Sequence, residues 1–305
     1  MSLTKSPSFP EKIESLVVGA GLAGLLTSAF LLKQGKHVVL AETTDKIGGR
    51  YSPEMRQGFQ FGAGLTFSAV WKQLAEQLAL PVEFLDLQNA GALLHTTRGW
   101  QAPEHLPDWE NHLAAASTFY PHGGYAGFCE RVLNFCQSYQ DKFQLFTNCP
   151  VSAIDAQEGS VRSVALGTKE NIPVGEVYWA GSFKPLLETL RGDATIPEHG
   201  APRVSWLRKF SKTTSNPGVI MEFAHKGKTT DFTETLFMPF QAQNEKEERR
   251  YLAGAFVSNR DHSLCERNKQ VSSWILPLTE NEWNDNHDTM KKIRAARRLL
   301  EKAFV

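Results

Sequence analysis

The first part of the chain is organised in apolar blocks. Residues 15–18 are a short apolar run that ends in glycine, which is typical of a strand buried on both faces. Residues 22–34 favour a helix, and Gly35 follows where a glycine cap would lie. Residues 37–41 form a second β-rich run. This order predicts a β-α-β unit of near-minimal length, and therefore a parallel sheet.

The middle of the chain predicts helices and then short strands. Residues 69–80 and 127–139 carry apolar side chains at helical spacing, and a further helix is expected around residues 109–119. Apolar and polar residues alternate between turn signals from residue 143 to residue 181. This alternation predicts a meander of three or four short strands.

The last third predicts mainly strands and one long helix. A short helix is expected at residues 184–190, and strands are expected at residues 218–224, 234–240 and 251–257. The charged run at residues 245–250 indicates a solvated hairpin loop. Thr279 and Glu282 have capping-box spacing and precede a basic amphipathic helix that ends near Phe304.

Length and charge limit the classes of protein to consider. A chain of 305 residues suggests about two domains. The 33 basic and 33 acidic residues balance, so charge gives no reason to expect a nucleic-acid partner. Residues 16–32 carry no charge, but they contain three glycines and are shorter than the roughly 20 residues of a membrane span. Without a signal-peptide pattern either, we expect a cytoplasmic protein with no integral membrane segment.

Cysteine and histidine spacing gives no metal site. Cys129, Cys136, Cys149 and Cys265 form no C-x-x-C pair, and we expect them to be reduced. The nine histidines form no H-x-x-x-H or H-E-x-x-H cluster. The sequence also lacks an arrangement typical of nucleophilic or paired-carboxylate catalysis, so it identifies no catalytic residue.

The candidate chemistry begins with a G-x-G-x-x-G pattern between the first predicted strand and helix. Gly19 permits a tight turn, Gly21 lets the backbone approach a pyrophosphate, and Gly24 allows the helix to pack closely on the strand. The helix begins at Leu22 and Ala23, where unpaired N–H groups can bind phosphate oxygens. This context predicts a dinucleotide site.

Glu42 ends the second predicted strand, 18 residues after Gly24. At this position a carboxylate can bind both ribose hydroxyls, and it would repel a 2′-phosphate, which disfavours NADP. Gly48, Gly49 and Arg50 follow almost at once. The order of G-x-G-x-x-G, acid and G-G-R resembles the flavin-containing amine oxidase and phytoene desaturase superfamily.

The resemblance assigns roles to further residues. It implies that Gly48, Gly49 and Arg50 form a second loop beside the pyrophosphate, with Arg50 pairing with phosphate oxygens. Residues 59–67 are similar to the superfamily's next element, in which small residues pass the isoalloxazine ring. The candidates there and later in the chain are Gly62, Ala63 and Gly64 beside the ring, Val151 at the adenine edge through its backbone, and Ala180 where the cofactor sheet closes.

The segment at residues 120–133 is similar to the superfamily's P-x-G-G start of a helix. His122 lies in it, and a loop histidine is more often structural than catalytic. The resemblance implies a discontinuous FAD-binding domain of residues 1–67 and 120–190, with a Rossmann-like parallel sheet and a β-meander. An inserted α+β substrate domain would comprise residues 68–119 and 191–278, and residues 279–305 would form a C-terminal helix.

The implied function is that of an FAD-dependent oxidoreductase, in which hydride passes from a substrate C–H bond to flavin N5. Because the flavin carries this chemistry, few catalytic side chains are needed. The predicted substrate is a small hydrophobic molecule or an amine, and the electron acceptor and oligomeric state stay open. Aromatic candidates for its pocket are Trp71, Trp100, Trp109, Trp206, Phe210, Phe223, Phe237 and Phe256.

The sequence departs from the superfamily pattern at its end. Superfamily members usually continue with a strand, a Gly-Asp element at the flavin and a last helix, whereas this sequence ends at Val305. The chain is then a fragment or a shortened homologue, and a non-catalytic FAD-binding protein is the second hypothesis. An NAD-dependent dehydrogenase is the third, supported only by the first β-α-β unit.

Overall fold

The computed structural model describes residues 9–65, 69–87, 91–104, 119–157, 160–191, 217–240 and 250–304. The chain divides into two compact units, and each is described by itself. The first unit comprises Met1–Ser52, Leu78–Leu80 and Cys129–Thr213, and the second comprises Pro53–Gln77, Pro81–Phe128 and Thr214–Val305. The segment 53–67, which the sequence predicts to belong with the cofactor domain, lies in the second unit.

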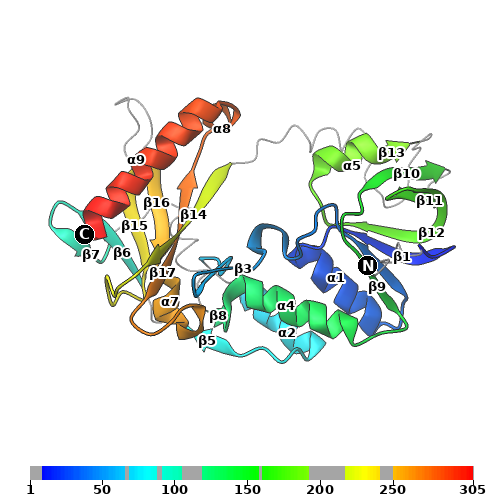
Figure 1. Ribbon diagram of the computed structural model, residues 1–305, viewed down its shortest axis with the longest axis horizontal. Coiled ribbons are helices and arrows are strands. Elements are labelled where there is room, and N and C mark those ends of the chain that lie inside the picture. Colours follow the sequence, from blue (N-terminus) through cyan, green and yellow to red (C-terminus); the bar gives the residue numbers. More distant parts are fainter. Residues whose placement is uncertain are drawn as a thin grey trace, which may run out of the picture. The chain divides into compact units, whose positions relative to one another are not determined.

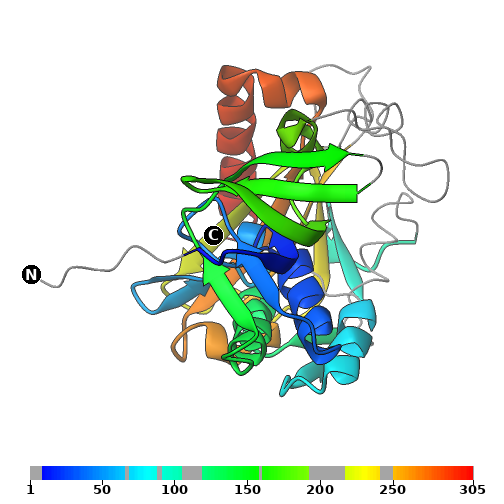
Figure 2. The ribbon, with the colours of Figure 1, turned by 90° about the vertical axis from the view of Figure 1, so that its right-hand side faces the viewer.

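The first unit is built on a seven-stranded sheet (Figure 1). Its strands, in spatial order, are β13 (Leu190–Arg191), β10 (Val151–Gln157), β11 (Ser160–Leu166), β12 (Lys169–Trp179), β1 (Ile13–Val18), β2 (Val38–Ala41) and β9 (Phe143–Phe146). β12, β1, β2 and β9 are parallel to one another, whereas β10, β11 and β12 form an antiparallel meander. Figure 2 shows the meander strands side by side in green.

The predicted parallel sheet and meander are therefore confirmed, with one correction. Residues 143–146 do not belong to the meander, because β9 pairs in parallel with β2. In β9, Phe143 and Phe146 are buried and Gln144 between them is exposed. The same alternation occurs in meander strands, so the apolar pattern alone does not distinguish the two kinds of pairing.

Helix α1 (Leu22–Lys33) connects β1 to β2 and is largely buried, which explains why this stretch carries no charge before Lys33. It ends where predicted, because Gly35 has a φ of +88° and donates its N–H to the carbonyl of Leu32. The predicted short helix near residue 184 is α5 (Phe183–Thr189). Among the helices of the described segments, none is long and apolar enough to cross a membrane.

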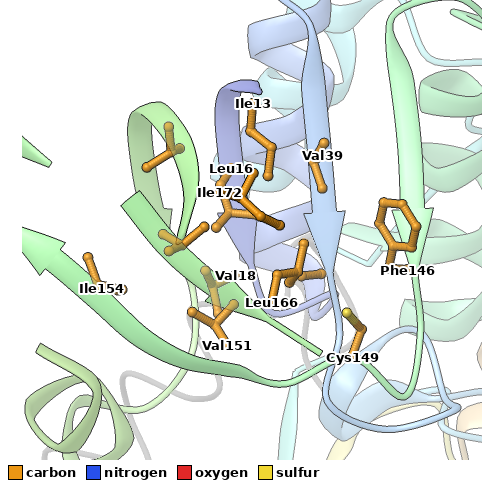
Figure 3. Close-up of a cluster of buried hydrophobic side chains, with 13 residues drawn as sticks. Ile13, Leu16, Val18, Val39, Phe146, Cys149, Val151, Ile154, Leu166 and Ile172 are labelled. Atoms are coloured by element: carbon orange, nitrogen blue, oxygen red, sulfur yellow. The ribbon is translucent and has the colours of Figure 1, made fainter. Parts of the chain in front are cut away.

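The core of the first unit lies between the meander and the parallel strands (Figure 3). Aliphatic side chains dominate it, and each one fully buried stabilises the fold by roughly 1.5–3 kcal/mol. Members drawn in the figure include Ile13, Leu16, Val18, Val39, Val151, Ile154, Leu166 and Ile172. The core therefore reaches the carboxyl end of β1, where the glycine turn begins.

The second unit is built on a six-stranded sheet. Its strands, in spatial order, are β14 (Gly218–His225), β17 (Gln270–Pro277), β16 (Arg250–Ala255), β15 (Thr235–Phe240), β6 (Ala92–Thr96) and β7 (Gly99–Gln101). All neighbours are antiparallel except β15 and β6. The predicted strand 251–257 ends earlier, because the chain leaves the sheet after Ala255 and enters helix α7 (Val257–Arg260).

Different elements cover the two faces of this sheet. Helix α9 (Asn286–Phe304) packs on one face, where its Leu300 contributes to a cluster with Met221 and Trp274 (Figure 1). On the other face, Ala253 and Ala255 cluster with residues from the segment 59–65 and from β8 (Phe119–Pro121).

Several short elements complete the two units. Two are 3-10 helices, η1 (Gly49–Tyr51) and η2 (His262–Leu264). Strand β3 (Glu54–Arg56) pairs with β4 (Phe59–Phe61), and β5 (Phe84–Asp86) pairs with β8. Helices α2 (Ala69–Leu78) and α4 (Gly124–Gln137) are also described.

The predicted capping box is confirmed, since Thr279 and Glu282 exchange hydrogen bonds at the start of α8 (Glu280–Asn284). It does not open the long helix, however. The chain is extended at Asp285, whose carboxylate accepts the N–H groups of His287 and Asp288 and caps α9. The predicted helix at 109–119 and the charged run 245–250 fall mostly outside the described residues, although Phe119 and Arg250 are in strands.

Candidate functional site

The glycine turn after β1 needs its small residues for steric reasons. Gly19 has a φ of +100° and donates its N–H to the carbonyl of Ala41, which ties the turn to β2. A Cβ on Gly24 would lie 1.8 Å from the carbonyl oxygen of Gly19. Ala180 follows β12, donates its N–H to Val18, and would be 3.3 Å from that same Cβ. Three segments therefore meet here, and only small side chains fit between them.

The first turn of α1 offers unpaired N–H groups. The helix begins at Leu22, and its N-cap residue Gly21 has no side chain to satisfy the exposed donors. The first turn also contains no acidic residue. Leu22, Ala23 and Gly24 thus present N–H groups and partial positive charge without competition from a carboxylate. Such a helix end is suited to bind a phosphate.

The second glycine loop contacts the first. Gly48 and Gly49 have φ values of +100° and +59°, and the N–H of Gly48 donates to the carbonyl of Ala20. A β-bridge joins Gly21 to Gly48, and a Cβ on Gly49 would lie 3.2 Å from the Cα of Gly21. Arg50 follows in an exposed position and forms no ion pair with any described residue. Its guanidinium is therefore available to an anion at these loops.

Glu42 has a second role that its position in the sequence does not reveal. Its Oε2 accepts the N–H of Ala20 at 2.8 Å, and its Oε1 accepts the N–H and the hydroxyl of Thr44 at 2.9 and 3.0 Å. A carboxylate has about four acceptor positions, so roughly one stays open, on Oε2. Accepting two ribose hydroxyls requires the Thr44 hydroxyl to turn away, toward the carbonyl of Lys46, which lies 3.3 Å from it.

Val151 begins β10, and its side chain is buried in the core of the first unit (Figure 3). Burial accounts for an apolar residue at this position without a ligand. The backbone contact with an adenine edge stays a prediction.

The predicted ring-facing residues Gly62, Ala63 and Gly64 belong to the second unit. Gly62 and Gly64 have φ values of +80° and +74°. The carbonyls of Gly62 and Ala63 accept N–H groups from Ala126 and Tyr125, at the start of α4. A Cβ on Gly124 would lie 2.6 Å from the Cα of Ala63, which explains why glycine is required at that helix start.

Three polar side chains also hold this segment. The Tyr120 hydroxyl donates to the carbonyl of Ala63 at 3.0 Å. Nη1 of Arg260 donates to the carbonyl of Leu65 at 2.9 Å, and the N–H of Gly62 donates to Oε2 of Glu222 at 2.9 Å. The sequence does not identify these supports. A sequence signal existed only for Glu222, an acid near the middle of an otherwise apolar predicted strand.

Burial shifts the ionisation of these supports. It raises the pKa of Tyr120 well above its ordinary value and lowers the pKa of Arg260 to about 10. It also raises the pKa of Glu222, which the N–H groups of Gly62 and Ala63 lower and the nearby carboxylate of Glu54 raises further. Tyr120 is therefore a neutral hydrogen-bond donor, and Arg260 keeps its proton at neutral pH.

His122 lies beside a buried acid. Its Nε2 is 3.8 Å from Oδ1 of Asp261, which also accepts the N–H and hydroxyl of Ser263. The other oxygen of Asp261 accepts the N–H of Gly123. Asp261 thus fixes the turn that precedes α4, and this geometry favours the structural interpretation of His122.

The aromatic candidates divide between the faces of the six-stranded sheet. Trp100, Phe223 and Phe256 pack on the α9 side, away from the Ala63 segment, in core or near-core positions. Phe237 is fully buried on the opposite side. Trp71 is half-buried in α2. Trp109, Trp206 and Phe210 lie outside the described residues.

The fold and the glycine turn define the class of domain at the start of the chain. Residues 17–78 match the family described as the NAD(P)-binding Rossmann-like domain. All-trans-retinol 13,14-reductase of Danio rerio is 38% identical over 58 residues, which are 19% of this chain and 10% of that protein. The match thus spans about a tenth of that relative's length.

Solved structures with the same fold cover most of the chain. An oxidoreductase from Methanosarcina mazei has a TM-score of 0.72 and 13% identity, over 96% of this chain and 85% of that one. Cyclohexylamine oxidase from Brevibacterium oxydans has a TM-score of 0.63 and 14% identity, over 96% of this chain and 81% of that one. Putrescine oxidase bound to putrescine has a TM-score of 0.62 and 13% identity, over 96% of this chain and 82% of that one. The predicted fold, and the resemblance to the amine oxidase superfamily at the level of the fold, are confirmed.

Proposed function

We propose that this protein is an FAD-dependent oxidoreductase of the amine oxidase type. The observation that carries the proposal is the backbone contact between two glycine loops, at Gly21 and Gly48, beside an uncapped helix and an unpaired arginine. A nicotinamide site of the Rossmann type needs only the first of these loops. The second loop and Arg50 add a cation and a bare stretch of backbone next to the first loop, which suits the binding of a diphosphate beside both loops.

The residues of the first unit suit the parts of FAD. The N–H groups of Leu22, Ala23 and Gly24 and the guanidinium of Arg50 would hold the diphosphate. Glu42 would accept a ribose hydroxyl at its open position on Oε2. Gly49 leaves the backbone bare at the loop contact. FAD supplies the hydride-accepting centre when bound.

The substrate assignment follows from the kind of chemistry and from the neighbours. Hydride transfer from a C–H bond requires that substrate be oriented and water excluded, and it needs no activated nucleophile. The neighbours are named for putrescine and cyclohexylamine as substrates, and the curated relative is named for retinol. These compounds are amines or small hydrophobic molecules, as is the substrate predicted from the sequence. We therefore propose that this chain acts on a small hydrophobic molecule or an amine.

The test begins with the visible spectrum of the purified protein and a titration with FAD. Arg50→Ala is expected to weaken FAD binding by at least about tenfold, since a charge-assisted hydrogen bond is worth roughly 1.5–3 kcal/mol. Arg56→Ala is the control, because Arg56 is exposed and already paired with Glu54. A colourless protein that takes up no added FAD would refute the proposal.

Further outcomes separate the competing functions. NAD binding that survives Arg50→Ala, with no FAD binding, would favour a nicotinamide enzyme. Bound FAD that no amine or polyene reduces anaerobically would favour a non-catalytic FAD-binding protein. Bleaching of the flavin by one class of these compounds would support the oxidoreductase and name its substrate class.

A further inference from the structure

The face of the six-stranded sheet opposite α9 carries two adjacent polar residues. Because side chains alternate along a strand, Met221 of β14 and Trp274 of β17 point toward α9, where they cluster with its Leu300. Glu222 and Ser273, their neighbours in the sequence, therefore point to the opposite face. That face packs against Ala63 and Tyr120, which belong to the predicted ring-facing segment and its support.

Glu222 and Ser273 are direct cross-strand partners. The register of β14 and β17 places them opposite each other, and Ala255 of β16 is opposite Ser273 on its other side. Directly opposed residues have Cβ atoms about 4.5–5.5 Å apart. A carboxylate and a hydroxyl thus lie side by side, next to a position with a short side chain.

Both residues have a buried oxygen without a hydrogen-bond partner. In the described part of the chain, Oε1 of Glu222 and Oγ of Ser273 are the only buried side-chain polar atoms of this kind. Each such atom destabilises the fold when it stays unpaired, because it has lost its hydrogen bonds to water. Buried polar atoms in native proteins nearly always have partners, so two orphans at opposed positions indicate a group that supplies donors.

The carboxylate also lacks a positive charge. Its other oxygen, Oε2, accepts the N–H of Gly62, and the N–H of Ala63 also favours the charged form, but neither donor carries a charge. The charged group that perturbs Glu222 among the described residues is another acid, Glu54. A buried carboxylate without a cation is costly, so the arrangement favours a cationic donor. An ammonium has three N–H donors and can satisfy a carboxylate oxygen and a hydroxyl together.

The geometry points to a site for an alkylammonium group, in which Oε1 of Glu222 and Oγ of Ser273 accept its N–H bonds. Such a site would bind a primary amine. The assignment of this amine as the substrate rests on the proposed function, whereas the binding site itself does not.

The binding of n-hexylamine to the full chain, with and without added FAD, tests the site by calorimetry. 1-Hexanol is the neutral probe of the same length. Glu222→Gln keeps an acceptor for Gly62 but loses the charge, and it is expected to weaken hexylamine binding by about tenfold or more. Ser273→Ala is expected to weaken binding by about threefold, since one neutral hydrogen bond is lost. Neither variant should change the binding of 1-hexanol.

Glu266→Gln is the matched control, because Glu266 is an exposed acid paired with Lys269 and should leave hexylamine binding unchanged. If Glu222→Gln does not fold, Glu222→Asp keeps the charge one methylene shorter and should bind hexylamine more weakly than wild type. Equal affinity of wild type and Glu222→Gln, or equal affinity for hexylamine and 1-hexanol, would overturn the site.

The two proposals fail separately. A protein that takes up no FAD but binds hexylamine through Glu222 loses the oxidoreductase assignment and keeps the ammonium site. A flavoprotein that oxidises a neutral polyene equally well with Glu222→Gln keeps its function and loses the site.

Discussion

Replacing Glu42 by glutamine changes one carboxylate oxygen into an amide nitrogen, and we expect the first unit to lose stability. Both oxygens accept backbone N–H groups, Oε2 from Ala20 at 2.8 Å and Oε1 from Thr44 at 2.9 Å. An amide has only one oxygen, so in either orientation its NH₂ group faces an N–H donor. Glutamine, usually a conservative replacement, therefore leaves one backbone donor unpaired.

The magnitude follows from these contacts. The bond from Ala20 is partly buried and charge-assisted, whereas the bonds from Thr44 are exposed. Losing one charge-assisted bond and weakening the others gives a destabilisation of about 2 kcal/mol. Thr44→Ala removes two exposed hydroxyl bonds, the one donated to Glu42 and the one accepted from the N–H of Lys46, and because both are exposed it should cost only about 0.5 kcal/mol.

Urea unfolding followed by circular dichroism measures both variants, and a parallel FAD titration measures the cofactor site. At unchanged slope, the midpoint shift reports the change in the free energy of unfolding. If Glu42→Gln and Thr44→Ala have the same free energy of unfolding, the two backbone bonds to Glu42 do not hold the turn, and the role assigned to this carboxylate is wrong.

Three further substitutions test the packing. Gly24→Ala should cost about 3 kcal/mol because its Cβ would lie 1.8 Å from a backbone carbonyl oxygen, while Gly227→Ala has open space and should change stability by less than about 0.5 kcal/mol. Tyr120→Phe removes a buried donor from two carbonyls and should cost about 1–2 kcal/mol in a urea titration. The Arg250 guanidinium, bonded to both oxygens of Glu282, holds the pKa of that carboxyl well below its usual range. Its stabilisation is present above about pH 4.5 and is lost as the pH falls further, so wild type should exceed Glu282→Gln by about 2 kcal/mol at pH 7 and by less at pH 3; an equal gap at both pH values would contradict this assignment.

Local rules were sufficient to predict the beginning of the first unit. Gly19, Gly24 and Gly35 occupy the turns and caps that the sequence assigns to them, because a missing Cβ acts on its immediate surroundings. Resemblance to a family predicted a second glycine loop at Gly48 and Gly49, but not its contact with Gly21. No propensity relates two loops 27 residues apart.

Long-range pairing limited the prediction elsewhere. β17 was not predicted, because Ser272 and Ser273 interrupt its apolar run, yet it lies between β14 and β16. Arg260 supports Leu65 from 195 residues away, and nothing near either residue indicates the contact. Such supports are chosen by the tertiary fold, which single-sequence patterns do not encode.

The position of Ala180 beside the glycine turn bears on how the protein is made. β1 pairs with β2 and with β12, and Ala180 at the end of β12 closes the turn at Gly19. During synthesis, Ala180 leaves the ribosome 161 residues after Gly19. Until then the nascent chain carries the full glycine motif without its neighbouring strand. We therefore expect cofactor loading to follow completion of the first unit, so that a polypeptide ending before β12 binds no dinucleotide although its motif is intact.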